Sequence, residues 1–283
     1  MMQDKHTTAA ADAGLTLIAA GREAEIYAWG EGSVLRLFRE QRPPLAIERE
    51  AAAMRAVRAS FPLVPEVRGE ASALGRPGLI LERVDGIDLL TRIDKKPWTI
   101  WNAGAISGGL HAQVHDIEAP AVMPSLRDRI NGSLAQPLVP PHLAEYARRE
   151  LESLPDGDRL CHGDFHPGNI LLSSHGPIVI DWPNAARGDP TADLARTIMM
   201  IEAAALPQGT ALVVRVGQRF GRRVLLAAYM RAYRRHRPVD AALLQRWITV
   251  RRIDRLAEDI PEERATLLAA AERSLARAIA ARS

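Results

Sequence analysis

The sequence is short of cysteine, of lysine and of long apolar runs, and each shortage narrows what the protein can be. Its single cysteine, Cys161, cannot form an internal disulfide and suits a reducing compartment. The N-terminal stretch MMQDKHTTAAADAG carries two aspartates and precedes only the short apolar piece LTLIAA, unlike a secretory signal peptide. Apolar runs such as TIMMIEAAAL are interrupted by charge well before the roughly 20 residues that a membrane-spanning helix needs. We therefore expect a cytoplasmic protein with no membrane partner.

Charge is distributed unevenly along the chain. Residues 1–190 carry 20 basic and 25 acidic side chains, whereas residues 191–283 carry 17 and 9. A basic stretch such as RAYRRHRP could attract nucleic acid or an anionic substrate. A solvated helix face explains such a run more simply, so nucleic acid is not the expected partner. The pattern makes no prediction about the oligomeric state.

The distribution of strand-like and helix-like segments along the chain predicts two lobes of an α+β fold. With 283 residues, of which 47% are apolar, the chain can build a sizeable core. In residues 15–84, strand-like pieces such as SVLRLFR and GLILERV surround one helix, LAIEREAAAMRAVRAS, which a Phe-Pro pair ends. From about residue 85 the pattern becomes mainly helical. We expect an N-terminal nucleotide-binding lobe over residues 1–84, a C-terminal catalytic and substrate-binding lobe over residues 85–283, and a ligand cleft between them.

One motif, HGDFHPGNILL, concentrates polar chemistry in the middle of the chain. It supplies Asp164 in a loop and Asn169 at the end of that loop. The strand-like pieces LLSS and PIVID follow, joined by the turn SSHGP, and lead to Asp181. A hairpin brings its two ends together, so Asn169 and Asp181 could offer an amide oxygen and a carboxylate to one cation. Such a set meets the needs of phosphoryl transfer, in which a carboxylate takes the proton of the attacking hydroxyl.

Two zinc sites are alternatives for the histidines. His162, Asp164 and His166 alternate along the chain and would share one side of a strand, but the following Pro-Gly pair favours a loop. The segment HAQVH places His111 and His115 four residues apart on a helix. It lacks the glutamate that a zinc protease uses as its base, so we assign these histidines to helix packing.

The segments HGDFHPGNILL and IDWPNAARGDPTADLA together resemble the catalytic core of the aminoglycoside phosphotransferase family, relatives of choline kinases with a protein-kinase-like fold. The resemblance follows the order of nearly the whole chain. It implies that Asp164 is the catalytic base, that Asn169 and Asp181 bind Mg²⁺, and that ATP is the donor. It also implies that His162 orders the loop and that Asp193 braces it, although a carboxylate near a helix start can instead cap that helix. The competing interpretation, an ordinary polar turn, requires all these groups to coincide by chance.

The residues expected to bind the nucleotide depart from the protein-kinase pattern in two ways. The predicted phosphate-covering loop, AAGREAEIYAWG, contains Gly21 alone and no GxGxxG. At the position of the usual lysine, the strand VLRLFR has Arg36, in a chain with only three lysines. Arginine keeps the positive charge and can pair with phosphate oxygens, but it is longer, so a shifted pose and a loss of catalysis both remain open.

Other contacts of the nucleotide are implied by position and by the resemblance. Glu48 and Glu50 are two residues apart on one predicted helix and face different directions, so only one can pair with Arg36. The family pattern favours Glu50. The adenine would be held by backbone groups of the connector around Glu82 to Val84.

The sequence therefore predicts an ATP- and Mg²⁺-dependent kinase that phosphorylates a hydroxyl of a small molecule, such as an aminoglycoside-like antibiotic, a sugar or an amino alcohol. The alternative is a non-catalytic nucleotide-binding pseudokinase or scaffold, which Arg36 and the scarce glycines motivate. The acceptor pocket leaves little signal. The acidic run EDIPEE could line it or form a turn between helices, and Trp98, Trp101, Trp182 and Trp247 could be ring walls or core.

Overall fold

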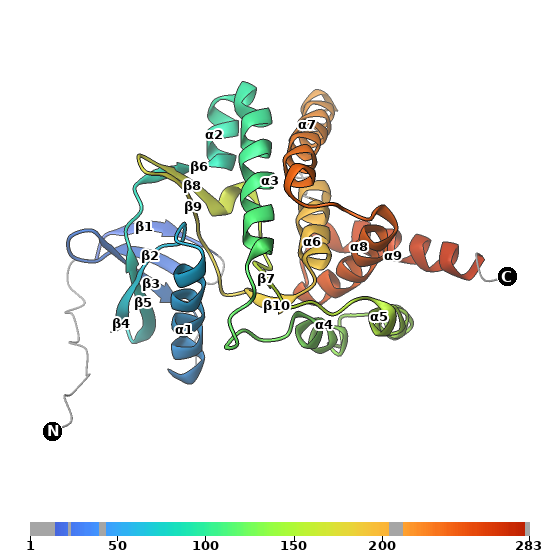
Figure 1. Cartoon of the computed structure of the whole chain (residues 1–283), viewed down its shortest axis with the longest axis horizontal. Coiled ribbons are helices and arrows are strands. Elements are labelled where there is room, and N and C mark those ends of the chain that lie inside the picture. Colours follow the sequence, from blue (N-terminus) through green and yellow to red (C-terminus); the bar gives the residue numbers. More distant parts are fainter. Residues whose placement is uncertain (1–14, 22–23, 40–43, 204–211, 281–283) are drawn as a thin grey trace. The chain divides into compact units, whose positions relative to one another are not determined.

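A computed structural model of the chain describes residues 15–21, 24–39, 44–203 and 212–280 (Figure 1). Contacts divide the chain into two compact units, Met1–Ile87 with Leu171–Pro183, and Asp88–Ile170 with Asn184–Ser283. The segment Leu171–Pro183 thus packs with the first unit, although it lies within the second lobe expected from the sequence. The expected α+β class is confirmed, because an antiparallel sheet dominates the first unit and helices dominate the second.

A five-stranded antiparallel sheet forms the first unit, in the order β1-β2-β3-β5-β4. Strand β3 is its centre, and its Leu35 and Leu37 are fully buried and pack with Ala71 and Ala73 of β4. Burying a leucine side chain contributes about 1.5–3 kcal/mol, so this apolar strand anchors the sheet. The strands are β1 (Leu17–Ala20), β2 (Ala24–Ala28), β3 (Ser33–Phe38), β4 (Val67–Ala73) and β5 (Arg76–Glu82).

Helix α1 (Pro44–Ser60) and a small three-stranded sheet complete this unit. The alanine-rich sequence of α1 favours a helix, as predicted, and this helix contacts β4 and β5. The small sheet has the order β6-β8-β9, with β6 (Gly86–Asp88), β8 (Ile170–Ser173) and β9 (Gly176–Val179). The predicted hairpin is therefore present as β8 and β9. Its end is fixed by the buried Trp182, whose ring lies against Phe61 and whose indole N–H donates to the Val179 carbonyl over 2.9 Å.

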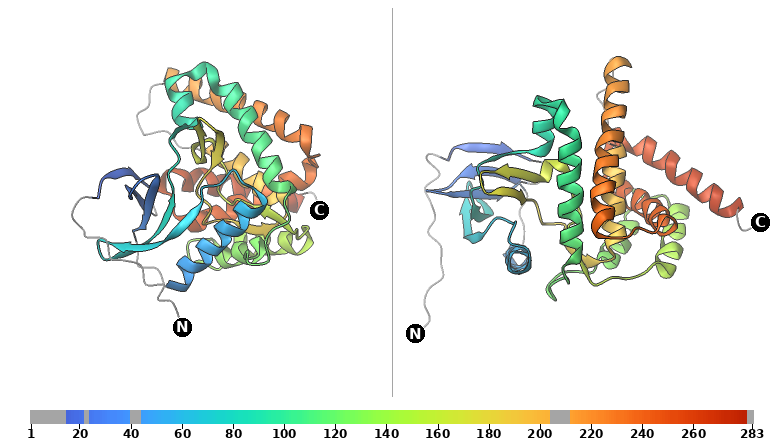
Figure 2. Two further views of the ribbon diagram at one scale, coloured as in Figure 1. Left: turned by 60° about the vertical axis from the view of Figure 1, so that its left-hand side comes forward. Right: turned by 45° about the horizontal axis from the view of Figure 1, so that its top comes forward.

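Helices dominate the second unit, and α3 and α7 lie side by side along much of their length (Figures 1 and 2). Its helices are α2 (Leu89–Lys95), α3 (Ile100–Asp116), α4 (Leu126–Leu134), α5 (Pro141–Ser153), α6 (Pro190–Ala203), α7 (Leu212–His236), α8 (Ala241–Arg255) and α9 (Pro261–Ala280). Three short 3-10 helices are η1 (Pro97–Thr99), η2 (Pro167–Asn169) and η3 (Leu256–Glu258). Strands β7 (Arg159–Cys161) and β10 (Ala186–Gly188) pair antiparallel.

Local sequence explains several helix starts in this unit. The side chains of Asp88, Ser125 and Asp240 accept backbone N–H groups at the starts of α2, α4 and α8. Within the acidic run EDIPEE, Asp259 and Ile260 form the turn between η3 and α9, and Pro261 is the first residue of α9. Among the described residues, no helix is both long enough and apolar enough to span a membrane.

The four tryptophans considered as ring walls divide into two pairs. Trp182 and Trp247 are 2% exposed and belong to the core. Trp98, in η1, is 77% exposed, and Trp101, at the beginning of α3, is 50% exposed. Only the second pair is therefore accessible to a ligand.

Candidate functional site

The loop that carries Asp164 begins at a residue that must be glycine. Gly163 follows β7 and has a φ of +80°, which side-chain-bearing residues rarely adopt. A Cβ atom there would lie 2.3 Å from the carbonyl oxygen of Asn184. Because of these two constraints, only glycine at position 163 allows the backbone conformation that exposes Asp164.

Asn169 closes the loop and has a defined orientation. Its Nδ2 donates to the Asp164 carbonyl oxygen over 2.9 Å, and its backbone N–H donates to the His166 carbonyl over 2.9 Å. Because a carbonyl oxygen can only accept, the amide of Asn169 must place its nitrogen there. Its Oδ1 is then the atom that could bind a cation.

The Asp164 carboxylate lies near positive charge without a close ion pair. Its side chain is 24% exposed, with Arg196 Nη2 4.0 Å from Oδ1 and His166 Nε2 3.9 Å from Oδ2. Arg196 is buried and is held by Glu258 at 2.7 Å. Burial alone would lower the pKa of Arg196. The negative charges of Glu258, Asp254 and Asp164 outweigh this effect and raise the pKa above its usual value, so the guanidinium stays charged. Both neighbours of Asp164 are beyond hydrogen-bond distance, so its oxygens can receive the hydrogen of a bound hydroxyl.

Asp193 braces the loop from the first turn of α6. Its Oδ2 accepts the backbone N–H of His162 over 2.6 Å, and its Oδ1 accepts that of Gly163 over 2.9 Å. The helix itself is capped instead by Asp189, whose carboxylate accepts the Thr191 N–H over 2.7 Å. Of the two roles considered for Asp193, the geometry therefore supports the brace.

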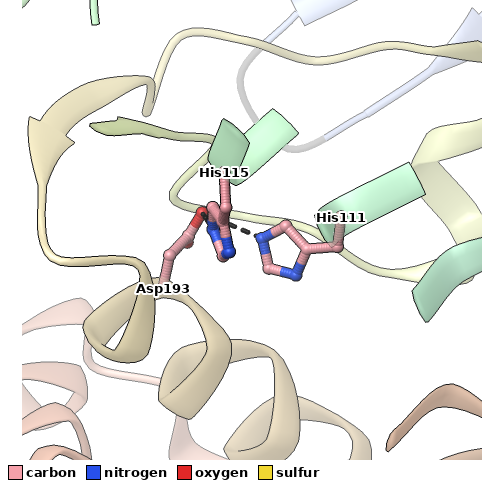
Figure 3. Close-up of side chains that lie close together, drawn as sticks. All are labelled: His111, His115 and Asp193. Atoms are coloured by element: carbon pink, nitrogen blue, oxygen red, sulfur yellow. Dashed lines mark hydrogen bonds and ion pairs between the residues drawn. The ribbon is translucent and has the colours of Figure 1, made fainter. Parts of the chain in front are cut away.

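Two histidines complete the surroundings of Asp193 (Figure 3). Nε2 of His111 and Nε2 of His115 lie 3.0 Å and 3.3 Å from its Oδ2, and all three side chains are buried. Burial opposes ionisation of Asp193, yet the hydrogen bonds from His111 and His115 hold its pKa well below the usual range. Burial, together with His115, lowers the pKa of His111 to about 3, so its ring is neutral.

His111, His115 and Asp193 have the side-chain types of a metal site, but their ligand atoms are already engaged in hydrogen bonds with one another and with two tyrosines. The ligand atoms of His111, His115 and Asp193 all lie within 4.8 Å of one another. Each imidazole, however, directs Nε2 at the carboxylate and Nδ1 at a tyrosine hydroxyl, Tyr229 for His111 and Tyr233 for His115. Both nitrogens of each ring are therefore engaged, and the neutral ring of His111 has no further lone pair for a cation. The expected role in helix packing was thus incomplete. The i, i+4 spacing placed both histidines on one face of a helix, but nothing in the sequence pointed to Asp193, which lies 82 and 78 positions away.

In the first unit, Arg36 joins two acidic side chains. It forms an ion pair with Glu50 of α1, while Glu48 is exposed. Its Nη2 also lies 3.2 Å from Oδ1 of Asp181, and its guanidinium lies 5.1 Å from the ring centre of Phe38. Asp181 is 42% exposed and has a φ of +66°, a strained conformation that Asp tolerates better than most residues.

The remaining predicted nucleotide contacts lie at the ends of strands or just beyond them, Gly21 after β1, and Glu82 and Val84 at and after the end of β5. Gly21 is exposed, and its carbonyl accepts Arg39 Nε over 2.8 Å, while residues 22 and 23 of the same loop lie outside the described residues. The Glu82 N–H donates to the Glu66 carbonyl over 2.8 Å. Within the described part of the chain, the N–H of the half-buried Val84 has no hydrogen-bond partner. Val84 is therefore the connector residue with a backbone donor to offer.

The structure thus brings the predicted residues together in two groups. Arg36, Glu50 and Asp181 meet in the first unit, and Asp164, Asn169, His162 and Asp193 form one loop and its brace in the second. The shared cation expected for Asn169 and Asp181 involves both units and stays a prediction.

Comparison with known proteins places this geometry in a family. Residues 14–243 match the sequence model described as the phosphotransferase enzyme family. No curated protein sequence matches the chain.

Solved structures with the same fold include three small-molecule kinases. An aminoglycoside-3′-phosphotransferase of type VIII has a TM-score of 0.63 and 19% identity, covering 85% of this chain and 94% of its own. An amicoumacin kinase, solved with AMP-PNP, Ca²⁺ and its ligand, has a TM-score of 0.58 and 13% identity, covering 92% and 86%. A choline kinase from Cryptosporidium parvum has a TM-score of 0.57 and 12% identity, covering 94% and 90%. At these identities the likeness establishes the fold, which is the protein-kinase-like fold predicted from the sequence.

Proposed function

Because the chain belongs to the phosphotransferase enzyme family, we propose that it transfers the γ-phosphate of ATP, with Mg²⁺, to a hydroxyl of a small molecule. The observation that carries this proposal is the catalytic loop. The turn at Gly163, the hydrogen-bonded amide of Asn169 and the buried carboxylate of Asp193 hold this loop in place. The loop exposes the carboxylate of Asp164, which has no close ion pair. Phosphoryl transfer depends mainly on positioning and charge, and this loop supplies positioning.

Asp164 is the group that we assign to the acceptor hydroxyl. It would accept the hydrogen of the hydroxyl as the oxygen attacks phosphorus. Arg196, 4.0 Å away and buried, places a fixed positive charge beside this carboxylate. A positioned base of this kind contributes about 10²–10⁴-fold to a rate.

Asn169 and Asp181 are the residues that we assign to Mg²⁺. Both offer hard oxygen atoms, which this cation prefers. The orientation of the Asn169 amide leaves Oδ1 for the cation, and the Asp181 carboxylate is partly exposed. Bound Mg²⁺ would neutralise charge on the phosphates.

Arg36, Gly21, Glu82 and Val84 are the residues that we assign to the nucleotide. Arg36 has the charge to meet phosphate oxygens, and Glu50 holds it in place. The backbone of Gly21 would approach the phosphates, and the Val84 N–H would donate to the adenine. The AMP-PNP bound to the amicoumacin kinase supports an adenine nucleotide as donor.

The acceptor is proposed only as a class. The similar structures include kinases named for aminoglycosides, amicoumacin and choline, which are hydroxyl-bearing small molecules. A cytoplasmic location forms part of the proposal and is supported by the single, buried, free thiol of Cys161.

The direct test is a substrate screen with matched variants. Purified protein with MgATP would be screened for ADP release against aminoglycosides, sugars and amino alcohols, and the modified hydroxyl would be located by mass spectrometry. Asp164→Ala should lower kcat by about 10²–10⁴-fold. Asp156→Ala, which removes an exposed carboxylate 3.5 Å from Arg127, should leave kcat unchanged. Undiminished turnover in Asp164→Ala would remove Asp164 from the mechanism.

A non-catalytic nucleotide-binding protein is the second candidate, and the contact between Arg36 and Asp181 favours it. That ion pair engages the carboxylate that a cation would need. ATP that stabilises the protein equally with and without Mg²⁺, combined with no turnover of any acceptor, would support this alternative.

A further inference from the structure

Helices α3 and α7 approach each other closely because α3 carries glycine at the contact. A Cβ atom on Gly108 would lie 2.1 Å from the carbonyl oxygen of Tyr229, and one on Gly104 would lie 2.5 Å from that of Leu225. The two backbones can therefore meet only where α3 has no side chain. One and two turns further along α3, His111 and His115 lie against Tyr229 and Tyr233 of α7.

The contact consists of two parallel pairs of side chains. His111 pairs with Tyr229 and His115 with Tyr233, so each helix contributes residues four positions apart. The hydroxyl of Tyr233 lies 2.6 Å from Nδ1 of His115. Both tyrosines are at most 2% exposed, so water does not compete for these hydrogen bonds.

The direction of each hydrogen bond follows from the carboxylate at the end. Asp193 can only accept, so Nε2 of each facing imidazole carries a hydrogen. The ring of His111 is neutral, so its Nδ1 is then an acceptor and the Tyr229 hydroxyl is the donor. The contact between His115 and Tyr233 repeats this arrangement. Two chains therefore run from hydroxyl to imidazole to Oδ2 of Asp193, which also accepts the His162 N–H.

His111 also contacts the residue that follows Asp164 in the loop, Phe165. The rings of His111 and Phe165 are stacked, 4.1 Å apart and 4° from parallel. The Phe165 carbonyl oxygen accepts the hydroxyl of Thr197 from α6 over 2.8 Å. Asp164 therefore lies between two held points, the amides of residues 162 and 163 before it and the ring and carbonyl of Phe165 after it.

We propose that Tyr229 and Tyr233 of α7 are positioning residues for the catalytic loop, acting through His111, His115 and Asp193. Neither tyrosine touches the loop amides, so they act by fixing the imidazoles and hence the carboxylate. Two chains on one oxygen restrain the rotation of Asp193 more than one would. The catalytic part of this proposal rests on the function proposed for Asp164, whereas the structural part does not.

Native-state amide hydrogen exchange of the full chain tests the proposal without any substrate. The variants are Tyr229→Phe, Tyr233→Phe and the double variant, which remove hydroxyls and keep the rings. Tyr27→Phe is the matched control, because it removes a hydroxyl that donates to Glu25 over 3.1 Å in the other unit. In the double variant, exchange at His162 and Gly163 should rise at least about tenfold, the factor expected for losing one ordinary hydrogen bond. Tyr27→Phe should leave exchange at these two amides unchanged.

A substitution at His115 separates positioning from general loosening. His115→Gln keeps a donor for Asp193 and an acceptor for Tyr233, so it should exchange more like the wild type than His115→Leu does. With an acceptor in hand, kcat should fall about tenfold in the double variant while the KM for MgATP stays within about twofold.

The outcomes decide the proposal in opposite directions. Unchanged exchange at His162 and Gly163 in the double variant would overturn it, as would a rise spread evenly over the whole second unit. If the wild type transfers no phosphate, the proposed function fails, but the exchange result still decides the positioning role.

Discussion

Nη2 of Arg36 lies 3.2 Å from Oδ1 of Asp181, while the same guanidinium pairs with Glu50. One arginine thus joins a strand, a helix and the residue after a hairpin, across 145 positions of sequence. A lysine has a single ammonium, whereas the arginine fork can face two carboxylates with different nitrogens. This relationship gives a physical reason for an arginine at this position.

Arg36→Met should weaken nucleotide binding and destabilise the first unit, because it removes the ion pair between Arg36 and the buried carboxylate of Glu50. We expect the KM for ATP to rise about tenfold or more, and the thermal shift caused by MgATP to shrink. Arg36→Lys should retain most of the shift. Arg149→Met, which removes an exposed arginine 3.0 Å from Glu145, is the control. Equal shifts in Arg36→Met and Arg149→Met would show that Arg36 does not meet the nucleotide.

Asp181→Asn should remove the dependence of nucleotide binding on Mg²⁺. At a MgATP concentration 100 times its Kd, the wild type should gain about 2.7 kcal/mol of stability. In the variant, that gain should fall to the level seen with ATP alone. Asp85→Asn, at an 80% exposed side chain, should behave as the wild type. A full Mg²⁺-dependent gain in Asp181→Asn would argue that this carboxylate is no cation ligand.

Gly163→Ala should destabilise the protein by about 1–3 kcal/mol, the usual cost of a side chain in a strained backbone region. The new Cβ would also lie 2.3 Å from the Asn184 carbonyl oxygen, so the loop must move. The comparison is Gly132→Ala in α4, where nothing lies within 4 Å of the added Cβ. That change should stabilise the helix by up to about 1 kcal/mol. Chemical denaturation of both variants checks the difference in sign.

Stability should decrease as the pH falls below about 6.5, the ordinary pKa of histidine. In the folded state, burial lowers the pKa of His111 to about 3, so between these values only the unfolded chain takes up this proton. The contribution of His111 to the free energy of unfolding is therefore fully present above pH 6.5. It is lost progressively down to pH 3, by at most about 1.4 kcal/mol per pH unit. Asp193 acts in the same direction at lower pH. Its contribution to stability is complete above its unfolded pKa and is lost as the pH falls from that value toward its depressed folded pKa.

Denaturant unfolding at pH 7.5, 6.5, 5.5 and 4.5 measures this slope. His111→Gln should flatten it, since the substituted side chain does not titrate. His175→Gln, at an exposed position in the turn between β8 and β9, provides the reference. Identical slopes in the two variants would mean that His111 contributes no pH dependence.

The loop that carries Asp164 and the hairpin after it were predictable because their signals are local. The spacing of Asp164, Asn169 and Asp181 around a hairpin is written within 18 consecutive residues, and the structure contains that hairpin. The helix-forming stretch that became α1 was recognisable from its alanine content and flanking prolines. The role of His111 and His115 was not, because Asp193 lies 82 and 78 positions away from them.

By itself, the amino-acid sequence determined the α+β class, the family and the residues of the loop, since these depend on short-range periodicity and spacing. Only the tertiary structure decided that Asp181 meets Arg36, that Asp189 rather than Asp193 caps α6, and that two tyrosines of α7 reach Asp193 through histidines. Such contacts arise when elements far apart in the chain pack together. Their side chains show no common pattern until the backbones are adjacent.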